Sequence, residues 1–357
     1  MQIVLCMDEN YAPMACVTLT SLLLNRTSNG TIEIHLCHNG ISDRSLGYFR
    51  QLEVTYNCKV NFYFVSLDKV DHLRAHLHIS NVMYFRLLLP EILKDKERIL
   101  YLDCDLIVET DLTELWNIDL NGTAVAGWDE GNIDHLERLS LTDFYINSGV
   151  LIMDLDSWRV DGLGSLCLDW IQHHKDLAQL PDQDAINVVL TGRKTSIHER
   201  FNLNPVWRHE NDLLERYPQR ILHFGGPIKP WDECYDFNLA EIYRRYVSVS
   251  PCRGNFPFRS SSNEIQTVQI GHQLYMAGKI EQACRRYHDA ITLAFRGKQI
   301  NSLLTVRSVN HGVAWYHNRN YVQACEHFLD ALESMGFSRE YSRNLYTNPG
   351  ILNNFFK

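Results

Sequence analysis

The chain has 357 residues, of which 45% are hydrophobic and 22% charged, and its net charge at pH 7 is −9. This length is too great for one small domain, and the composition is that of an ordinary globular protein, which argues against disorder. The negative net charge argues against nucleic acid as the main partner.

The ten cysteines are scattered singly with no C-x-x-C pair, which is typical of reduced, buried thiols in the cytoplasm. The N-terminal apolar stretch runs directly into Asp8 and Glu9, so it does not have the form of a secretory signal. No apolar run is long enough to cross a bilayer. We therefore expect a cytoplasmic protein without a transmembrane segment, soluble or peripheral at the inner face of the membrane.

Strand and helix patterns alternate through the first two thirds of the chain. Short apolar runs predict strands at residues 3–7, 32–37, 60–65 and 98–102, and the last of these is apolar enough to be buried on both faces. Helical patterns cover residues 12–25 and 42–52, and Ser42 is a suitable N-cap for the second. This alternation predicts an α/β domain with a mostly parallel central sheet flanked by helices.

Polar residues follow two of these strands, as Asp8-Glu9-Asn10 and Asp103-Cys104-Asp105. Ligands of parallel sheets bind beyond the carboxyl ends of the strands, so both segments are candidate binding loops.

The composition changes after residue 249. The segment 250–263 contains prolines, a glycine and a serine cluster, and it reads as a linker between a domain at 1–249 and a helical domain at 264–357. Within the helical domain small and aromatic residues recur 41 positions later: Gly271, Ala283, Tyr287 and Ala290 correspond to Gly312, Ala324, Phe328 and Ala331. This pattern resembles tetratricopeptide repeats and predicts a small all-α domain. Two repeats are too few to stand alone, so we expect packing on the first domain, on another subunit or on a protein partner.

The strongest chemical signal is the pair of carboxylates Asp103 and Asp105 directly after a buried strand. Two such groups can hold one hard divalent cation, which is suited to bridging phosphates. A capping or turn role is the alternative.

The second signal is the loop from His223 to Trp231. His223 offers a nitrogen ligand, which favours Mn²⁺ over the alternative Mg²⁺. Gly226 allows close approach of the backbone to phosphate, and Lys229 offers a positive charge to a leaving pyrophosphate.

Together, the segments 100–105 (LYLDCD) and 223–231 (HFGGPIKPW) resemble glycosyltransferase family 8 over about residues 1–235. The resemblance implies the GT-A fold of nucleotide-diphospho-sugar transferases. It also implies a UDP-sugar donor, Mn²⁺ as cofactor and retention of anomeric configuration. The favoured sugar is glucose or galactose, and the acceptor is a glycan, glycolipid or glycoprotein.

The resemblance also assigns roles to residues of this sequence. The implied metal ligands are Asp103, Asp105 and His223. The implied donor-binding residues also include Asp8, Asn10, Tyr11, His78, Arg86, Cys104, Gly226 and Lys229. The implied residues around the transferred sugar are Asp129, Asn147, Asp182 and Gln183, and a turn or cap is the alternative role for Asp129.

Retention requires either a covalent intermediate or attack on the same face that the leaving group departs from. The amide of Gln183 is a poor nucleophile, so we expect same-face attack, with the leaving phosphate oxygen taking the acceptor proton. Two other functions are compatible with parts of this pattern. A haloacid-dehalogenase-type phosphatase also places Asp-x-Asp after a strand but leaves the loop at 223–231 unexplained. A scaffold acting through its repeats would tolerate loss of the donor-site residues, which are all present.

Overall fold

The computed structural model describes residues 1–73, 80–204, 213–225, 229–232, 237–258, 264–276, 278–295 and 303–334. The chain forms two compact units. The first comprises residues 1–204, 212–224 and 245–256, and the second comprises residues 205–211, 225–244 and 257–357. The division expected at residues 249 and 263 stays a prediction.

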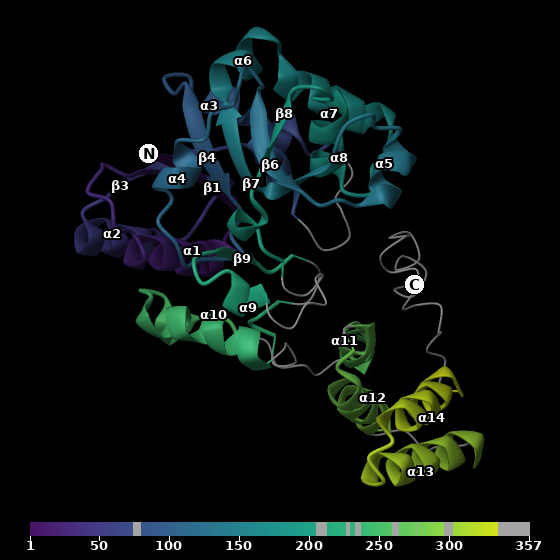
Figure 1. Ribbon diagram of the computed structural model, residues 1–357. Helices are drawn as coiled ribbons and strands as arrows, with labels where there is room; N and C mark the ends of the chain where they lie inside the picture. The colour runs from purple at the N-terminus through teal and green to yellow at the C-terminus, as the bar shows by residue number, and fades with distance from the viewer. Residues whose placement is uncertain are drawn as a thin grey trace. The chain divides into compact units, whose positions relative to one another are not determined.

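A seven-stranded sheet forms the centre of the first unit (Figure 1), with strand order β3-β2-β1-β4-β7-β6-β8. Its strands are β1 (Gln2–Met7), β2 (Glu33–His38), β3 (Lys59–Phe64), β4 (Arg98–Leu102), β6 (Val125–Asp129), β7 (Ile146–Asp154) and β8 (Lys194–Ile197). The strands β3, β2, β1 and β4 are parallel, as are β6 and β8, whereas β7 runs antiparallel to both β4 and β6. The predicted α/β class with a mostly parallel sheet is confirmed.

The elements predicted from apolar periodicity are present in the first hundred residues. Helix α1 (Ala12–Leu24) begins with Pro13 in its first turn, and α2 (Asp43–Tyr56) begins after Ser42. The Ser42 hydroxyl accepts a hydrogen bond from the main-chain N–H of Ser45, so the predicted N-cap is confirmed. Helix α2 extends one turn beyond the prediction and ends at Asn57, which adopts the left-handed conformation.

Helices cover both faces of the sheet. One cluster of buried hydrophobic residues lies between β1, β4, β6 and β7 on one side and the helices α3 (Phe85–Ile92), α6 (Leu155–Val160), α7 (Leu163–His173) and α8 (Pro181–Val189) on the other. Helices α1 and α2 lie on the opposite side of the sheet (Figure 1), where Phe49 of α2 packs edge-on against Phe62 of β3. The sheet is therefore buried on both sides, as expected for parallel strands.

Shorter elements complete the first unit. A two-stranded antiparallel sheet joins β5 (Leu106–Val108) to β9 (Ile221–His223). The remaining helices and 3-10 turns are η1 (Leu67–Lys69), η2 (Asn81–Tyr84), α4 (Thr113–Trp116), α5 (Ile133–Leu139), η3 (Glu199–Phe201), α9 (Leu213–Arg216) and η4 (Arg253–Asn255). Helix α10 (Phe237–Val249) has residues in both units.

The second unit contains two helix pairs, α11 (Glu264–Met276) with α12 (Ile280–Phe295) and α13 (Leu303–His317) with α14 (Tyr321–Ser334). A Cβ atom placed on Gly271 would lie 2.5 Å from the Tyr287 ring, and one on Gly312 would lie 2.5 Å from the Phe328 ring. Each glycine thus lets an aromatic ring pack directly on the neighbouring helix backbone. The predicted helical tail is confirmed, while its tetratricopeptide character stays a prediction. No described helix is both long and apolar enough to cross a membrane.

Candidate active site

Two pairs of strands bring the candidate metal ligands together. Parallel pairing of β1 with β4 places the loops after both strands at the same edge of the sheet. Pairing of β5 with β9 sets Leu106 opposite His223, so the histidine lies beside Asp105. The imidazole Nε2 of His223 is 3.6 Å from an oxygen of Asp105 and 3.8 Å from an oxygen of Asp103.

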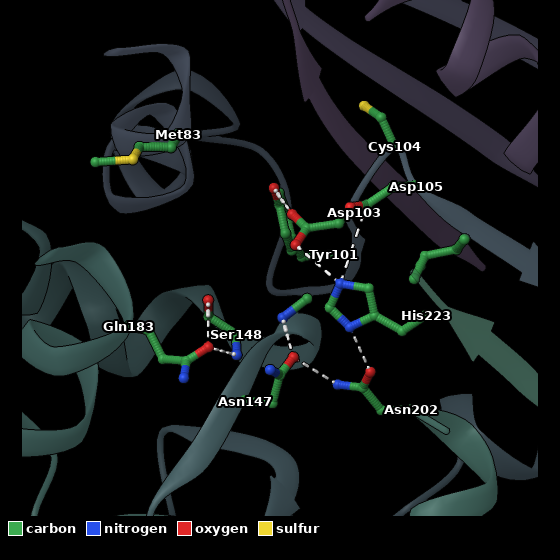
Figure 2. A network of polar contacts seen from close by, with 12 residues as sticks. Met83, Tyr101, Asp103, Cys104, Asp105, Asn147, Ser148, Gln183, Asn202 and His223 are labelled. Atoms are coloured by element: carbon green, nitrogen blue, oxygen red, sulfur yellow. Dashed lines mark hydrogen bonds and ion pairs between the residues drawn. The ribbon is translucent and has the colours of Figure 1, made fainter. Parts of the chain in front are cut away.

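These three side chains fit a divalent cation. One ligand atom from each of Asp103, Asp105 and His223 lies within 4.8 Å of the other two. Among the described residues, these three side chains form the one group of potential metal ligands that lie this close together. Two carboxylates and an imidazole form a donor set that suits Mn²⁺. Figure 2 shows the His223 ring between the two aspartates and Asn202.

Asn202 determines which nitrogen of His223 faces the aspartates. The Asn202 side-chain oxygen lies 2.8 Å from Nδ1 of His223, and the Asn202 amide nitrogen donates to the side-chain oxygen of Asn147 at 2.8 Å. Because the Asn202 oxygen can only accept, Nδ1 is the donor in this contact, and Nε2 is the nitrogen that faces Asp103 and Asp105. This arrangement orients a metal-binding histidine through a second residue, as metal sites commonly do.

The start of β7 packs directly against the candidate metal ligands. Antiparallel pairing with β4 places Gly149 beside Asp103, whose main-chain N–H donates to the Gly149 carbonyl at 2.8 Å. A Cβ atom at Gly149 would lie 2.3 Å from Cε1 of His223 and 2.9 Å from a carboxylate oxygen of Asp103. Only glycine therefore leaves room for both ligands at this position.

Arg86 is a buried cation next to the ligand cluster. It lies in the first turn of α3 and forms ion pairs with Asp103 at 2.8 Å and Asp182 at 3.0 Å. It also donates to the carbonyl and hydroxyl of Ser148, and its guanidinium lies over the Tyr101 ring. Burial opposes ionisation, but the neighbouring carboxylates raise the pKa of Arg86 above its ordinary value. Arg86 therefore stays charged.

Asp182 and Gln183 lie in the first turn of α8, and both are buried. Burial and the charge of Asp103 raise the pKa of Asp182, while Arg86 opposes that change. The side-chain oxygen of Gln183 accepts from the main-chain N–H of Ser148 at 2.9 Å and from its hydroxyl at 3.2 Å. Both candidate catalytic side chains therefore already have strong partners.

Two residues of this network, Asn202 and Glu130, were not among the residues predicted from the sequence. Glu130 follows Asp129 after β6 and accepts from the amide nitrogens of Asn147 at 2.6 Å and Gln183 at 3.4 Å. Burial and the charges of Asp184 and Asp129 raise its pKa to about 7, although the two amide hydrogen bonds oppose that rise. The only sequence signal for Glu130 is the doubled acid at a strand end.

The contacts that the structure gives for several other predicted residues lie outside the ligand cluster. Asp129 accepts from the main-chain N–H of Gly131, and Asp8 accepts from that of Tyr11, so both have turn contacts. Asn10 is exposed. The thiol of Cys104 is buried and donates to the carbonyl of Cys6, and Figure 2 shows this side chain pointing away from His223. Their roles in donor binding stay predictions.

Three further predicted residues do not belong to the described part of the first unit. His78 and Gly226 lie outside the described residues. Lys229 belongs to the second unit, where its main-chain N–H donates to the Asp232 carboxylate at 2.8 Å. Their roles in donor binding also stay predictions.

Comparison with known proteins gives consistent results. The family model described as glycosyl transferase family 8 matches residues 2–234. General stress protein A of Bacillus subtilis is 29% identical over 268 residues, covering 70% of this chain and 94% of that protein. Lipopolysaccharide 1,2-glucosyltransferase of Escherichia coli K12 is 24% identical over 306 residues, covering 79% of this chain and 89% of that protein. The structure of the galactosyltransferase LgtC with donor and acceptor sugar analogs superposes with a TM-score of 0.64 at 26% identity, covering 72% of this chain and 100% of LgtC.

Proposed function

The chain belongs to glycosyl transferase family 8, and on that premise we propose that it is a retaining, Mn²⁺-dependent hexosyltransferase with a UDP-sugar donor. The observation that carries the proposal is the cluster of Asp103, Asp105 and His223 beside the buried cation of Arg86. The cluster offers ligands for a cation, and Arg86 offers a second positive charge where a diphosphate would lie.

The proposed roles follow from the chemistry of donor cleavage. Asp103, Asp105 and His223 would hold Mn²⁺, which when bound neutralises charge developing on a leaving diphosphate. Arg86 keeps its charge through its ion pairs and directs the Asp103 carboxylate, while Asn202 takes the Nδ1 hydrogen bond of His223 and leaves Nε2 facing the metal position. Lys229, by its place in the family motif, supplies a further positive charge to the leaving group.

Same-face attack is the mechanism that the contacts favour. The acceptor oxygen bonds to the anomeric carbon as the bond from that carbon to the diphosphate oxygen breaks, and the departing phosphate oxygen takes the acceptor proton. A covalent intermediate would require Asp182 or Gln183 to act as nucleophile. Asp182 is paired with Arg86, and the Gln183 oxygen accepts two hydrogen bonds from Ser148, so both oxygens are restrained.

The acceptor we propose is a glycan, glycolipid or glycoprotein. The glucosyltransferase and galactosyltransferase relatives favour glucose or galactose as the transferred sugar. Residues 264–357, whose sequence resembles tetratricopeptide repeats, would recruit a glycoprotein, another partner or a second subunit. Such an enzyme would act in the cytoplasm or at the inner face of the membrane.

The test is UDP release from a panel of UDP-sugars with and without Mn²⁺, in wild type and in Asp105→Ala. We expect slow metal-dependent hydrolysis of one donor that the variant loses. Asp176→Ala is the matched control, because Asp176 is exposed and has no partner among the described contacts. UDP binding without turnover of any donor would favour the scaffold, and absence of metal-dependent UDP binding would refute the proposal.

A further inference from the structure

Glu130 lies between two side-chain amides of the site. Its side chain is only 16% exposed, and one carboxylate oxygen accepts from Nδ2 of Asn147 and Nε2 of Gln183. When Glu130 is ionised, as it is above about pH 7, its carboxylate can only accept hydrogen bonds. Both amides therefore have their NH₂ groups toward Glu130 and their oxygens toward the start of β7, and the Gln183 NH₂ group also donates to the Tyr145 hydroxyl at 3.1 Å.

The two amide oxygens hold the segment that lines the metal ligands. The Asn147 oxygen accepts from the main-chain N–H of Gly149 at 2.9 Å and from the Asn202 amide at 2.8 Å. Reversing the Asn147 amide would place its NH₂ group against both of these donors. The orientation of Asn147 therefore determines the orientation of Asn202.

Asn202 in turn determines the state of His223. With its NH₂ group donating to Asn147, Asn202 presents its oxygen to Nδ1 of His223 at 2.8 Å, as Figure 2 shows for these three side chains. A reversed Asn202 would present a donor there and favour a proton on Nε2, which faces Asp103 and Asp105. A protonated Nε2 cannot bind a metal.

We propose that Glu130 is a positioning residue that, through Asn147 and Asn202, holds His223 in its metal-binding tautomer and also orients the Gln183 amide. The metal-binding part of this inference rests on the proposed function. Its tautomer part concerns the metal-free protein and stands independently.

The surroundings of Glu130 support a functional role over a stabilising one. The nearest cationic candidate, Nε2 of His135, is 3.8 Å from the carboxylate, beyond hydrogen-bond distance. Asp129 and Asp184 add negative charge, and burial raises the pKa of Glu130 to about 7. A glutamine would avoid this cost to folding, and ionisable groups with perturbed pKa values concentrate at functional sites.

The test compares Glu130→Leu and Glu130→Gln with Glu137→Gln, a matched control on the exposed face of α5. Nitrogen-15 chemical shifts of the His223 ring in the metal-free protein report the tautomer. Binding of Mn²⁺ alone reports ligand geometry, and kcat and KM are measured with the donor that wild type hydrolyses. We expect Glu130→Leu to populate both tautomers and to lose about 10- to 100-fold in Mn²⁺ affinity, as other residues behind metal ligands do.

Glu130→Gln retains an acceptor oxygen, so it should restore the Nδ1–H tautomer and most of the Mn²⁺ affinity. The inference is overturned if Glu130→Leu keeps a single tautomer and wild-type Mn²⁺ affinity, or if Glu130→Gln loses as much as Glu130→Leu. If Glu130→Leu does not fold, Glu130→Ala replaces it with the same expected changes. If wild type binds no Mn²⁺, the proposed function fails. The tautomer comparison then still tests the series of hydrogen bonds that runs from Glu130 to His223.

Discussion

Replacing Gly149 by alanine should disable the candidate metal site while leaving most of the fold intact. The added Cβ would lie 2.3 Å from Cε1 of His223, whereas ordinary contacts begin near 3.4 Å. The ring must therefore move by about 1 Å or the β7 backbone must shift, because the same Cβ would also approach Asp103 at 2.9 Å. Metal–ligand distances in protein sites lie within about 0.2 Å of their standard values, so a shift of this size would take His223 out of ligand position.

The expected effects of Gly149→Ala have two parts. Overpacking of a buried site costs about 1–3 kcal/mol in the free energy of unfolding. Displacement of His223 should lower Mn²⁺ affinity by at least about tenfold, by comparison with the loss caused by changing residues behind metal ligands. Denaturant unfolding measures the first, and calorimetric titration with Mn²⁺ measures the second.

Gly47→Ala is the control for this experiment. Gly47 lies exposed inside α2, and nothing lies within 4 Å of a Cβ placed on it. Alanine there should stabilise the protein by about 0.5–1 kcal/mol and leave Mn²⁺ binding unchanged. Wild-type Mn²⁺ affinity and stability in Gly149→Ala would refute the close packing of Gly149 against His223.

Three further predictions test other parts of the structure. The folded protein retains a proton on Glu130 up to about pH 7, whereas the unfolded chain releases it near pH 4.5, so stability falls as pH rises through that window. Glu130→Gln should remove up to about 3 kcal/mol of that fall, measured without metal by denaturation at both ends of the window, and an unchanged pH dependence would contradict the raised pKa. Asn202→Leu removes the hydrogen-bond partner of Nδ1 of His223. It should lower the free energy of unfolding by about 1–3 kcal/mol and weaken Mn²⁺ binding by about tenfold or more. Wild-type Mn²⁺ affinity in this variant would show that Asn202 does not orient the ring. Gly312→Ala would drive a Cβ to 2.5 Å from Phe328 and should speed amide hydrogen exchange in α14, whereas unchanged exchange would mean that this contact does not hold the helix pair.

The sequence alone determined the parts of this protein that depend on short segments. Apolar runs and a serine cap located β1, α1, β2, α2, β3 and β4, because burial on a regular element imposes a period on neighbouring residues. The aspartates after β4 and the histidine of the loop at 223–231 were recognisable because each belongs to a compact motif. The glycine and aromatic repeat of the helical tail was visible for the same reason.

Only the tertiary structure decided how these segments meet. The antiparallel direction of β7 places Gly149 under the ligands, and the β5–β9 pair carries His223 to Asp105. The polar chain from Glu130 through Asn147 and Asn202 joins segments that are far apart in sequence. No local pattern marks such residues, because a single asparagine or glutamate acquires its role from partners that long-range pairing brings within hydrogen-bond distance.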